Sequence, residues 1–367
     1  MRAARTNITR SRLSALPRVL LASRVWLLCV WLCAMAGLTA GDVRAADEPK
    51  APLAIQFSLD RPIDAAAAPF VLASAGGLFS AEGLAVTINI AGGSQDAVAR
   101  VATGTSDFAV VDINALMRFR DKEKQGGPRI KAVFMLFNKA PYAIIARKSR
   151  GVMALTDIEG KTLGVAEGDL SARLWPAVAN LNGIKPKSVK QTSIGAAVRE
   201  PMLSAGQIDA VTGFSYLSAI NLRDRGVPAD DLAVLKFADY GCEAYGFAII
   251  VNPALAAAKP EAVKAFVRAV TGGVNLTIKN PTIAAAEVVS RMDGGSKDLE
   301  LERLHSILRD NILTNEVKRN GIGSIDPVRF ERSIDQVAED FKFQKRPQTA
   351  DIFDDQFLPP LNGRLIN

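Results

Sequence analysis

Short β-rich runs alternate along the chain with stripes of apolar residues at helical spacing, a pattern typical of α/β proteins. The clearest unit is VTINIAGGSQDAVARVATGTSDFAVVD at residues 86–112. Its apolar positions predict a strand at 86–90, a helix at 95–103 and a strand at 108–111. Open α/β sheets bind ligands beyond the carboxyl ends of their strands, so this unit predicts half of a small-molecule site.

The loop between the first strand and the helix supplies candidate ligand contacts. We expect the Ser94 hydroxyl to cap the helix, and the N–H groups of the first turn, including that of Gln95, to stay free for a ligand. Gly104 is expected to end the helix. Asp112 follows the second strand at the same edge of the sheet. Ser94, Gln95 and Asp112 are therefore candidate binding residues.

The ending of this unit is repeated about a hundred residues later along the chain. VATGTSDFAVV at 101–111 and LSAGQIDAVT at 203–212 each contain a helix tail, a glycine, two further residues, an aspartate and then a strand. We interpret the glycines and aspartates as helix-stop and turn residues. Two units of one design predict two similar lobes, each a mixed sheet flanked by helices, with a ligand cleft between them.

The second unit offers candidates at the equivalent edge. A strand at 162–166 runs into Glu167 and Asp169, and a helix follows at 172–181. Asp169 or Ser171 can cap this helix, whereas Arg173 in its first turn opposes the helix dipole unless an acid or a ligand offsets it. The candidate contacts of this lobe are Glu167, Asp169, Ser171, Arg173 and Phe214, and Tyr245 in the returning loop completes the set. Phe214 could equally serve as packing between the lobes.

Domain boundaries follow from the charged and loop segments. We take the charged turn at 147–151 as the first crossing between lobes and the segment 239–251 as the return. Apolar stripes at helical spacing then predict helices that refill the first lobe. The expected organisation is lobe one at 46–145 and 247–345, lobe two at 146–246, and a C-terminal tail at 346–367 that packs on the lobes.

Residues 1–45 have the composition of a secretory signal peptide. They contain seven arginines and a single acid, Asp42. An apolar run at 25–36 is shorter than the ~20 residues that span a bilayer, and Val43-Arg44-Ala45 suits cleavage. We expect export to the periplasm with cleavage near Ala45.

Removal of the signal peptide would change the net charge and the cysteine content of the chain. The whole chain carries a net charge of +7, and its first 45 residues contribute +6 of this, so the mature chain is close to neutral. The basic balance therefore gives no reason to expect a nucleic-acid partner. Cys29 and Cys33 would leave with the signal peptide, and Cys242 alone cannot form a disulfide within one chain.

Groups for catalysis are scarce. His305 is the only histidine, on a segment patterned for packing, which argues against a histidine-based metal site or a catalytic triad. Gly92-Gly93-Ser94 lacks the lysine and the spacing of a phosphate loop. Lys139 or Lys161 could in principle form a Schiff base. We expect no enzyme activity, no metal and no cofactor.

Several short motifs in the expected order resemble one family. They are Ala75-Gly76-Gly77-Leu78-Phe79 with Glu82-Gly83-Leu84, Ala102-Thr103-Gly104-Thr105-Ser106-Asp107-Phe108, Asp157-Ile158-Glu159-Gly160-Lys161-Thr162, Leu181-Asn182-Gly183-Ile184, and Phe353-Asp354-Asp355-Gln356-Phe357-Leu358-Pro359. Together they look like periplasmic solute-binding proteins of the nitrate, sulfonate, taurine and thiamine-precursor group. The resemblance implies a monomeric receptor of an ABC importer, with a small-molecule ligand and a permease and ATPase complex as its partners.

One departure from this family bears on the ligand. Members that bind the thiamine pyrimidine precursor carry Trp, Asn and His where this chain has Arg61, Asp64 and Ala67. Arg61, just after the first strand, is a cation placed to meet an anion. A small organic anion such as a sulfonate or carboxylate is therefore the expected ligand. The alternatives are pyrimidine binding by the same fold, a sensor for a membrane regulator, and an enzyme of the related pyrimidine-synthesis type.

Overall fold

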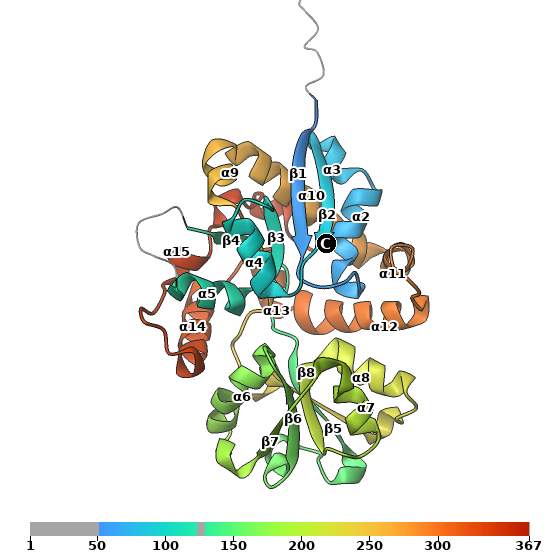
Figure 1. Ribbon diagram of the computed structural model, residues 1–367. Coiled ribbons are helices and arrows are strands. Elements are labelled where there is room, and N and C mark those ends of the chain that lie inside the picture. The colour runs from blue at the N-terminus through green and yellow to red at the C-terminus, as the bar shows by residue number, and fades with distance from the viewer. Residues whose placement is uncertain (1–50, 123–128, 367) are drawn as a thin grey trace, which may run out of the picture. The chain divides into compact units, whose positions relative to one another are not determined.

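The computed structural model describes residues 51–122 and 129–366 (Figure 1), so the predicted signal peptide lies outside the described residues. The described part contains two five-stranded mixed sheets flanked by helices, which is the predicted two-lobed α/β architecture. No helix in these two ranges is long and apolar enough to cross a membrane.

Lobe one is built on the sheet β2-β1-β3-β10-β4. β1 pairs in parallel with β2 and β3, and β10 pairs antiparallel with β3 and β4. Its strands are β1 Leu53–Leu59, β2 Leu84–Ile90, β3 Phe108–Asp112, β4 Lys131–Met135 and β10 Phe247–Val251.

Lobe two is built on the sheet β7-β6-β8-β5-β9, with the same arrangement of directions. β6 pairs in parallel with β7 and β8, and β5 pairs antiparallel with β8 and β9. Its strands are β5 Tyr142–Arg147, β6 Thr162–Ala166, β7 Lys190–Ile194, β8 Ala210–Phe214 and β9 Leu232–Lys236. In each sheet the fourth strand is therefore the one that enters from the other lobe.

The first crossing between the lobes differs from the expected one. Because β5 already belongs to the second sheet, the chain crosses at 136–141 and not at the charged turn 147–151. That turn is a surface turn within lobe two, held where Asp231 accepts hydrogen bonds from Arg147 and Ser149. The return crossing runs from β9 to β10 through 237–246.

Helices cover both sheets (Figure 1). Those before the return crossing are α2 Ala68–Ala75, α3 Leu78–Ala81, α4 Ser94–Ala102, α5 Ile113–Lys122, α6 Leu170–Leu181, α7 Arg199–Ser204 and α8 Ser215–Asp224. Those after it are α9 Pro253–Ala258, α10 Pro260–Lys279, α11 Pro281–Val289, α12 Lys297–Ile307, α13 Asn315–Asn320, α14 Pro327–Phe341 and α15 Thr349–Ile352. In the C-terminal tail, Phe353 forms a bridge to Ala132 of β4 and so attaches the tail to lobe one.

The repeated chain endings have the predicted structural role. Gly104 and Gly206 adopt positive φ angles of 76° and 70°, as a helix stop requires. The carboxylate of Asp107 accepts the N–H of Gln56 at 2.7 Å, and that of Asp209 accepts the N–H of Thr162 at 2.9 Å. Both aspartates thus fasten the start of a strand, β3 or β8, to the parallel strand beside it, β1 or β6.

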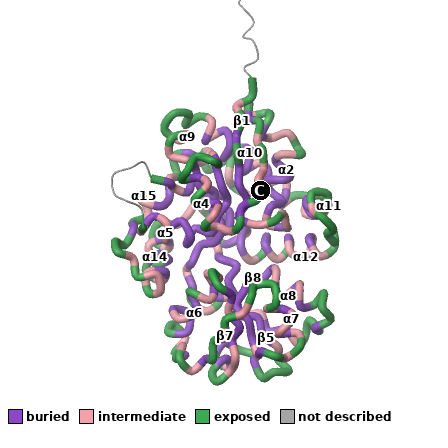
Figure 2. The backbone as a smooth tube through the Cα atoms, viewed as in Figure 1, coloured by how far each residue is buried: buried purple, intermediate pink, exposed green. Residues whose placement is uncertain are grey.

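Aromatic side chains fill the core of lobe one beneath α2 and α10. Phe108 and Phe266 stack with ring centroids 4.0 Å apart, and Phe57 meets Phe266 edge-on at 5.3 Å. Gly273 allows the close approach of α10 to α2, since a Cβ there would lie 2.1 Å from the carbonyl oxygen of Pro69. The inner strands β3 and β10 of lobe one and β5 and β8 of lobe two are almost entirely buried (Figure 2), which gives the carboxyl ends of these strands a rigid base.

Candidate ligand-binding cleft

A cavity of about 410 Å³ lies between the two lobes. It is bordered by the carboxyl ends of β1 and β3 and the start of α4 in lobe one, and by the ends of β6 and β8 and the starts of α6 and α7 in lobe two. This is the edge where open α/β sheets bind ligands. The lining residues are Asp60, Arg61, Gly92, Gly93, Ser94, Gln95, Asp112, Ala115, Ala166, Glu167, Gly168, Asp169, Leu170, Ala196, Arg199 and Phe214.

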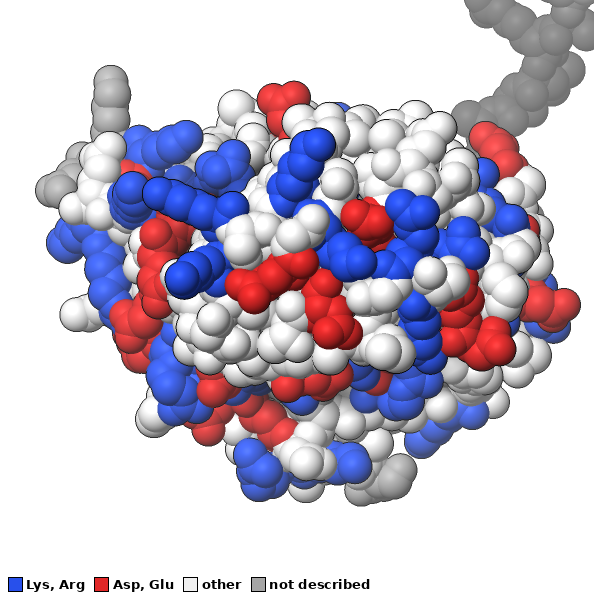
Figure 3. All heavy atoms as spheres, turned by 90° about the horizontal axis from the view of Figure 1, so that it is seen from below, with Lys and Arg blue, Asp and Glu red and all other residues white. Residues whose placement is uncertain are grey.

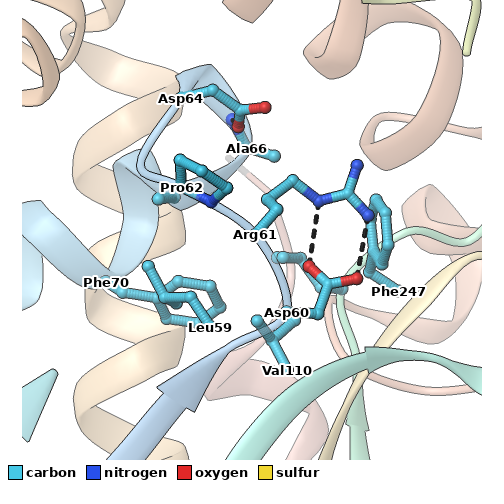
Figure 4. A pocket seen from close by; sticks show the side chains of 11 residues that line it. Leu59, Asp60, Arg61, Pro62, Asp64, Ala66, Phe70, Val110 and Phe247 are labelled. Atoms are coloured by element: carbon cyan, nitrogen blue, oxygen red, sulfur yellow. Dashed lines mark hydrogen bonds and ion pairs between the residues drawn. The ribbon is translucent and has the colours of Figure 1, made fainter. Parts of the chain in front are cut away.

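Arg61 is held in place on the lobe-one side of the cleft. Its Nε and Nη2 donate to the two carboxylate oxygens of Asp60 at 2.9 and 2.8 Å (Figure 4). Its guanidinium carbon also lies 4.3 Å from the ring centre of Phe247 and 4.9 Å from that of Phe214. Burial opposes the charge of Arg61, but pairing with Asp60 raises its pKa well above the usual range. The cation is therefore permanent and already neutralised by its neighbour.

Behind Arg61 lies a small enclosed space of about 20 Å³, lined largely by apolar side chains such as Phe70 and Val110 (Figure 4). Asp64 borders it and accepts the N–H of Ala66 at 2.8 Å. Burial raises the pKa of Asp64 to about 6. The space is too small for a solute, and it shares only Asp60 and Arg61 with the lining of the cleft.

Lobe two presents a matching ion pair. Nη1 of Arg199 donates to Oδ2 of Asp169 at 2.9 Å and to the carbonyl oxygen of Thr212 at 2.9 Å. The Thr212 hydroxyl donates to the same carboxylate oxygen at 2.7 Å, as the Ser94 hydroxyl does to Asp60 at 2.6 Å in lobe one. Asp169 also accepts the N–H of Ser171 and caps α6, as predicted. Each lobe thus offers one arginine, one aspartate and one hydroxyl.

Ser94 does not cap α4, contrary to the prediction. Gly93, with φ at 124°, is the residue before the first turn, and no side chain caps this helix. Ser94 is the first helical residue, and its hydroxyl accepts the N–H of Asp112 at 3.0 Å while it donates to Asp60. The N–H groups of the first turn, including that of Gln95, consequently have no intrahelical acceptor.

Asp112 joins the cleft to the other lobe. Its carboxylate accepts a hydrogen bond from the hydroxyl of Tyr142, and the backbone and side-chain N–H groups of Asn114 donate to it at 2.9 Å each. Asp112 is 1% exposed. Burial raises its pKa to about 7, against the lowering effect of these hydrogen bonds. Tyr142 begins β5, so this contact bridges the two sheets.

The lining of the cleft is acidic in balance. Its two cations, Arg61 and Arg199, are each paired with an aspartate. Asp112 and Glu167 also line the cleft, and within the described ranges neither makes an ion pair. An anionic solute would therefore be repelled on balance, because the cleft is lined by more carboxyl groups than cations.

Seven of the ten residues predicted from the sequence line this cleft, and three do not. Ser171 is fully buried and its hydroxyl donates to Asp169. Arg173 is exposed and acts electrostatically on Asp340 of α14. Tyr245 is fully buried, donates to Glu316 at 2.7 Å and lies under the guanidinium of Arg329.

Asp60 and Arg199 were missed by the sequence reasoning. Asp60 directly follows β1 and precedes Arg61, and a carboxylate beside a cation at a strand end was a signal for an ion pair. Arg199 begins α7, so that it lies in the first turn of a helix, as Arg173 does. Which of the two first-turn arginines points into the cleft depends on the rotation of its helix, which the sequence pattern leaves open.

The described ranges contain no group of three or more His, Cys, Asp or Glu side chains placed to hold a metal ion. His305 is exposed on α12 and does not line the cleft. Burial raises the pKa of the Cys242 thiol to about 11, so this buried cysteine is not an activated nucleophile.

Basic and acidic side chains are intermixed on one face of the surface. On the face viewed from below, on the side of lobe two, basic and acidic groups alternate without an extended area of one sign (Figure 3). This face lacks the continuous basic surface by which proteins contact nucleic acids.

Residues 64–284, more than half of the chain, match the family described as NMT1/THI5 like. The chain belongs to this family. It is 28% identical over 213 residues to the 4-amino-5-hydroxymethyl-2-methylpyrimidine phosphate synthase of Legionella pneumophila, a match that covers 58% of this chain and 66% of that one. It is 30% identical over 224 residues to the riboflavin-binding protein RibY of Chloroflexus aurantiacus, covering 58% and 59%. Both matches thus span less than two thirds of the relative.

Solved structures establish the fold as that of periplasmic binding proteins. The periplasmic aliphatic sulphonate binding protein SsuA from Escherichia coli aligns with a TM-score of 0.63 at 13% identity, over 83% of this chain and 99% of that one. The alkanesulfonate-binding protein SsuA from Xanthomonas axonopodis pv. citri, bound to MOPS, aligns with a TM-score of 0.60 at 14% identity, over 83% and 98%. The predicted fold and family are confirmed.

Proposed function

We propose that this family member is the solute-binding component of an ABC importer and captures a small, neutral or cationic nitrogen heterocycle between its lobes. The observation that carries this proposal is the charge balance of the cleft. Both arginines are neutralised by aspartates, and Asp112 and Glu167 add carboxyl groups without cationic partners. An uncharged heterocycle avoids the repulsion that an anion would meet there.

The other cleft groups suit a flat, hydrogen-bonding solute. The ring of Phe214 lines the cleft and packs against Arg61. Asp112 and Glu167 offer oxygen acceptors, and the first turn of α4 offers N–H donors. The names of the two relatives point to the same chemistry, a pyrimidine in one and riboflavin in the other.

The architecture supports capture by closure. The lobes are linked by the crossings 136–141 and 237–246, and the cleft is lined from both sides. A solute that contacts both lobes favours the state in which they approach each other. In this proposal the protein works in the periplasm, and its closed form is presented to a permease and ATPase in the inner membrane.

A small organic anion is the second candidate. The free N–H groups at the start of α4 favour it, because a helix N-terminus attracts negative charge. The two arginines also retain N–H groups beyond those that bind Asp60 and Asp169. An anion held this way would depend on hydrogen bonds rather than on net charge.

An enzyme of the pyrimidine-synthesis type is the third candidate, favoured by the name of the Legionella relative. Incubating the purified protein with a small-molecule cell extract and searching the products for 4-amino-5-hydroxymethyl-2-methylpyrimidine phosphate by mass spectrometry tests it. Formation of a phosphorylated pyrimidine would replace the receptor proposal.

A thermal-shift screen distinguishes the receptor candidates. The probes are riboflavin, 4-amino-5-hydroxymethyl-2-methylpyrimidine, thiamine, taurine, MOPS and benzoate. A probe at one hundred times its dissociation constant adds about 2.7 kcal/mol to the free energy of unfolding, which is readily detected. We expect a heterocycle to raise the melting temperature. A shift with the sulfonates or benzoate alone would favour the organic anion.

A further inference from the structure

Helices α8 and α12 lie side by side at the boundary between the lobes (Figure 1). α8 follows β8 and packs on β5 and β9 of lobe two. α12 belongs to lobe one, where its Leu304 and Ile307 are buried in the hydrophobic core. Neither helix contributes a residue to the lining of the cleft. The lobes therefore also touch at a place apart from the cleft.

Both helices are anchored at the first crossing. The N–H of Ser215, the first residue of α8, donates to the carbonyl oxygen of Pro141 at 2.8 Å. Asn311 lies in the π-helical turn that directly follows α12, and its Nδ2 donates to the carbonyl oxygen of Lys139 at 3.0 Å. α8 thus begins, and α12 ends, beside the crossing 136–141. The two helices extend from it as a pair of arms, one from each lobe.

Polar contacts join the arms further from the crossing. Nη2 of Arg303 on α12 donates to Oδ1 of Asn221 on α8 at 2.6 Å, and Arg223 forms an ion pair with Glu302. Asn221 and Arg223 lie about 9 and 12 Å along α8 from its first residue, at a rise of about 1.5 Å per residue. A rotation of the lobes about the crossing moves these distant residues most, so that separation of the lobes breaks the contacts.

A buried carboxylate links this contact to the cleft. Glu300 on α12 is 1% exposed, accepts the N–H of Ala65 at 2.7 Å and forms an ion pair with Arg303. Ala65 directly follows the loop 60–64, whose Arg61 lines the cleft. Arg303 therefore holds α8 of lobe two on one side and, through Glu300, the base of the Arg61 loop on the other.

We propose that Arg303 is a positioning residue for solute capture, because its contacts with Asn221 and Glu300 hold the lobes at their present spacing. We call these three residues the latch. This inference rests on the proposed capture of a solute by closure of the lobes. The side chain of Arg303 is only 14% exposed, so its charged hydrogen bond is shielded from water. A solute that contacts both lobes binds more tightly when a larger fraction of the free protein has them close together.

Solution X-ray scattering of the purified, solute-free protein tests the latch, because the radius of gyration increases when the lobes separate. Asn221→Ala removes the acceptor of Arg303 but leaves the pair of Glu300 and Arg303, so no buried carboxylate loses its cation. Asn221→Asp keeps an oxygen acceptor at the same position. Asn89→Ala is the matched control, because Asn89 is also half-buried and donates to Gln56 at 2.9 Å entirely within lobe one.

A charge swap tests the same contact independently. Arg223→Glu places two carboxylates opposite each other, and Glu302→Arg added to it restores a pair of opposite charge. We expect a larger radius of gyration for Asn221→Ala and for Arg223→Glu, and the wild-type radius for Asn221→Asp, Asn89→Ala and the swapped pair. The proposal is overturned if Asn221→Ala keeps the wild-type radius, if Asn89→Ala shows the same increase, or if the swap fails to reverse the effect of Arg223→Glu.

Titration calorimetry with riboflavin and 4-amino-5-hydroxymethyl-2-methylpyrimidine connects the latch to binding. Asn221→Ala should raise the dissociation constant of the heterocycle that binds about threefold or more, and Asn221→Asp should restore it. An unchanged dissociation constant in Asn221→Ala would also overturn the role in capture. If neither heterocycle binds any form of the protein while the radii change as expected, the proposed function fails and the latch stands. Unchanged radii together with heterocycle binding would remove the latch and leave the proposed function.

Discussion

The hydroxyl of Tyr142, the first residue of β5 in lobe two, donates a hydrogen bond to the carboxylate of Asp112, the last residue of β3 in lobe one. Asp112 lines the cleft and Tyr142 follows the first crossing. The pair therefore links the site where a solute would bind to the segment about which the lobes would move.

Tyr142→Phe should lower the free energy of unfolding by about 1–3 kcal/mol, because a buried carboxylate loses a donor that nothing replaces. Urea denaturation measures this directly. Tyr216→Phe is the matched control, since Tyr216 is equally buried but its hydroxyl is 3.5 Å from the only hydrogen-bonding partner among the described residues, Arg61 Nη1. Equal losses of unfolding free energy in the two variants would show that the hydrogen bond from Tyr142 to Asp112 adds no stability of its own.

Stability should fall as the pH rises through the folded-state pKa of Asp112, which burial raises to about 7. The folded protein holds this proton between the ordinary aspartate pKa, about 4, and pH 7, whereas the unfolded chain does not. The stabilising contribution is thus complete below pH 4 and lost as the pH rises to 7. Asp64, with a pKa raised to about 6, acts in the same direction.

Asp112→Asn should flatten this dependence. Melting temperatures of the wild type and the variant between pH 4 and 8 provide the comparison, and their difference isolates Asp112 from all other groups. Parallel curves for the two proteins would mean that Asp112 ionises normally in the folded state.

Arg199→Met should destabilise the protein by about 1–3 kcal/mol, because Asp169 would remain nearly buried without its cation. The double variant Arg199→Met with Asp169→Asn should recover much of this loss, since it removes the uncompensated charge. A double-mutant cycle by chemical denaturation measures the coupling. Strictly additive losses would contradict the paired state on which the charge balance of the cleft rests.

Arg329→Lys should loosen both crossings. Arg329 donates to Asn138 in the first crossing at 2.9 and 3.0 Å and to Glu243 in the return crossing at 3.1 and 3.2 Å, and a lysine cannot reproduce this fork. Hydrogen exchange at 136–141 and 237–246 should accelerate in the variant. Arg268→Lys, which loses a comparable fork to Glu82 outside both crossings, should leave exchange there unchanged.

The sequence predicted those features that depend on local chemistry. Gly104 and Gly206 could be recognised as helix stops because each is followed by a turn and a strand, and the structure gives both a positive φ. The first crossing was misplaced because Tyr142–Arg147 is an apolar run that would suit either sheet. Strand pairing depends on residues distant in the sequence, so a local pattern does not reveal which sheet receives it.

The same division holds in the site. Residues at or just beyond the carboxyl ends of strands, such as Arg61, Asp112 and Glu167, could be placed because strand direction decides at which edge of the sheet they lie. Ser171 and Arg173 lie inside a helix, where a rotation of one residue by about 100° separates the cleft from the core. Ser94 does not cap α4 because Gly93 occupies the cap position with a positive φ angle, which the pattern of apolar residues does not specify.

Titration calorimetry on the wild type and on Glu167→Gln tests the central claim, an acidic cleft that selects against anions. The probes are riboflavin and 4-amino-5-hydroxymethyl-2-methylpyrimidine against taurine and MOPS. We predict that a heterocycle binds the wild type with a lower dissociation constant than either sulfonate. Glu167→Gln should reduce the ratio of these dissociation constants, because it removes a negative charge and so lets the sulfonates bind more tightly. Tighter binding of a sulfonate by the wild type, with no gain in Glu167→Gln, would contradict the account.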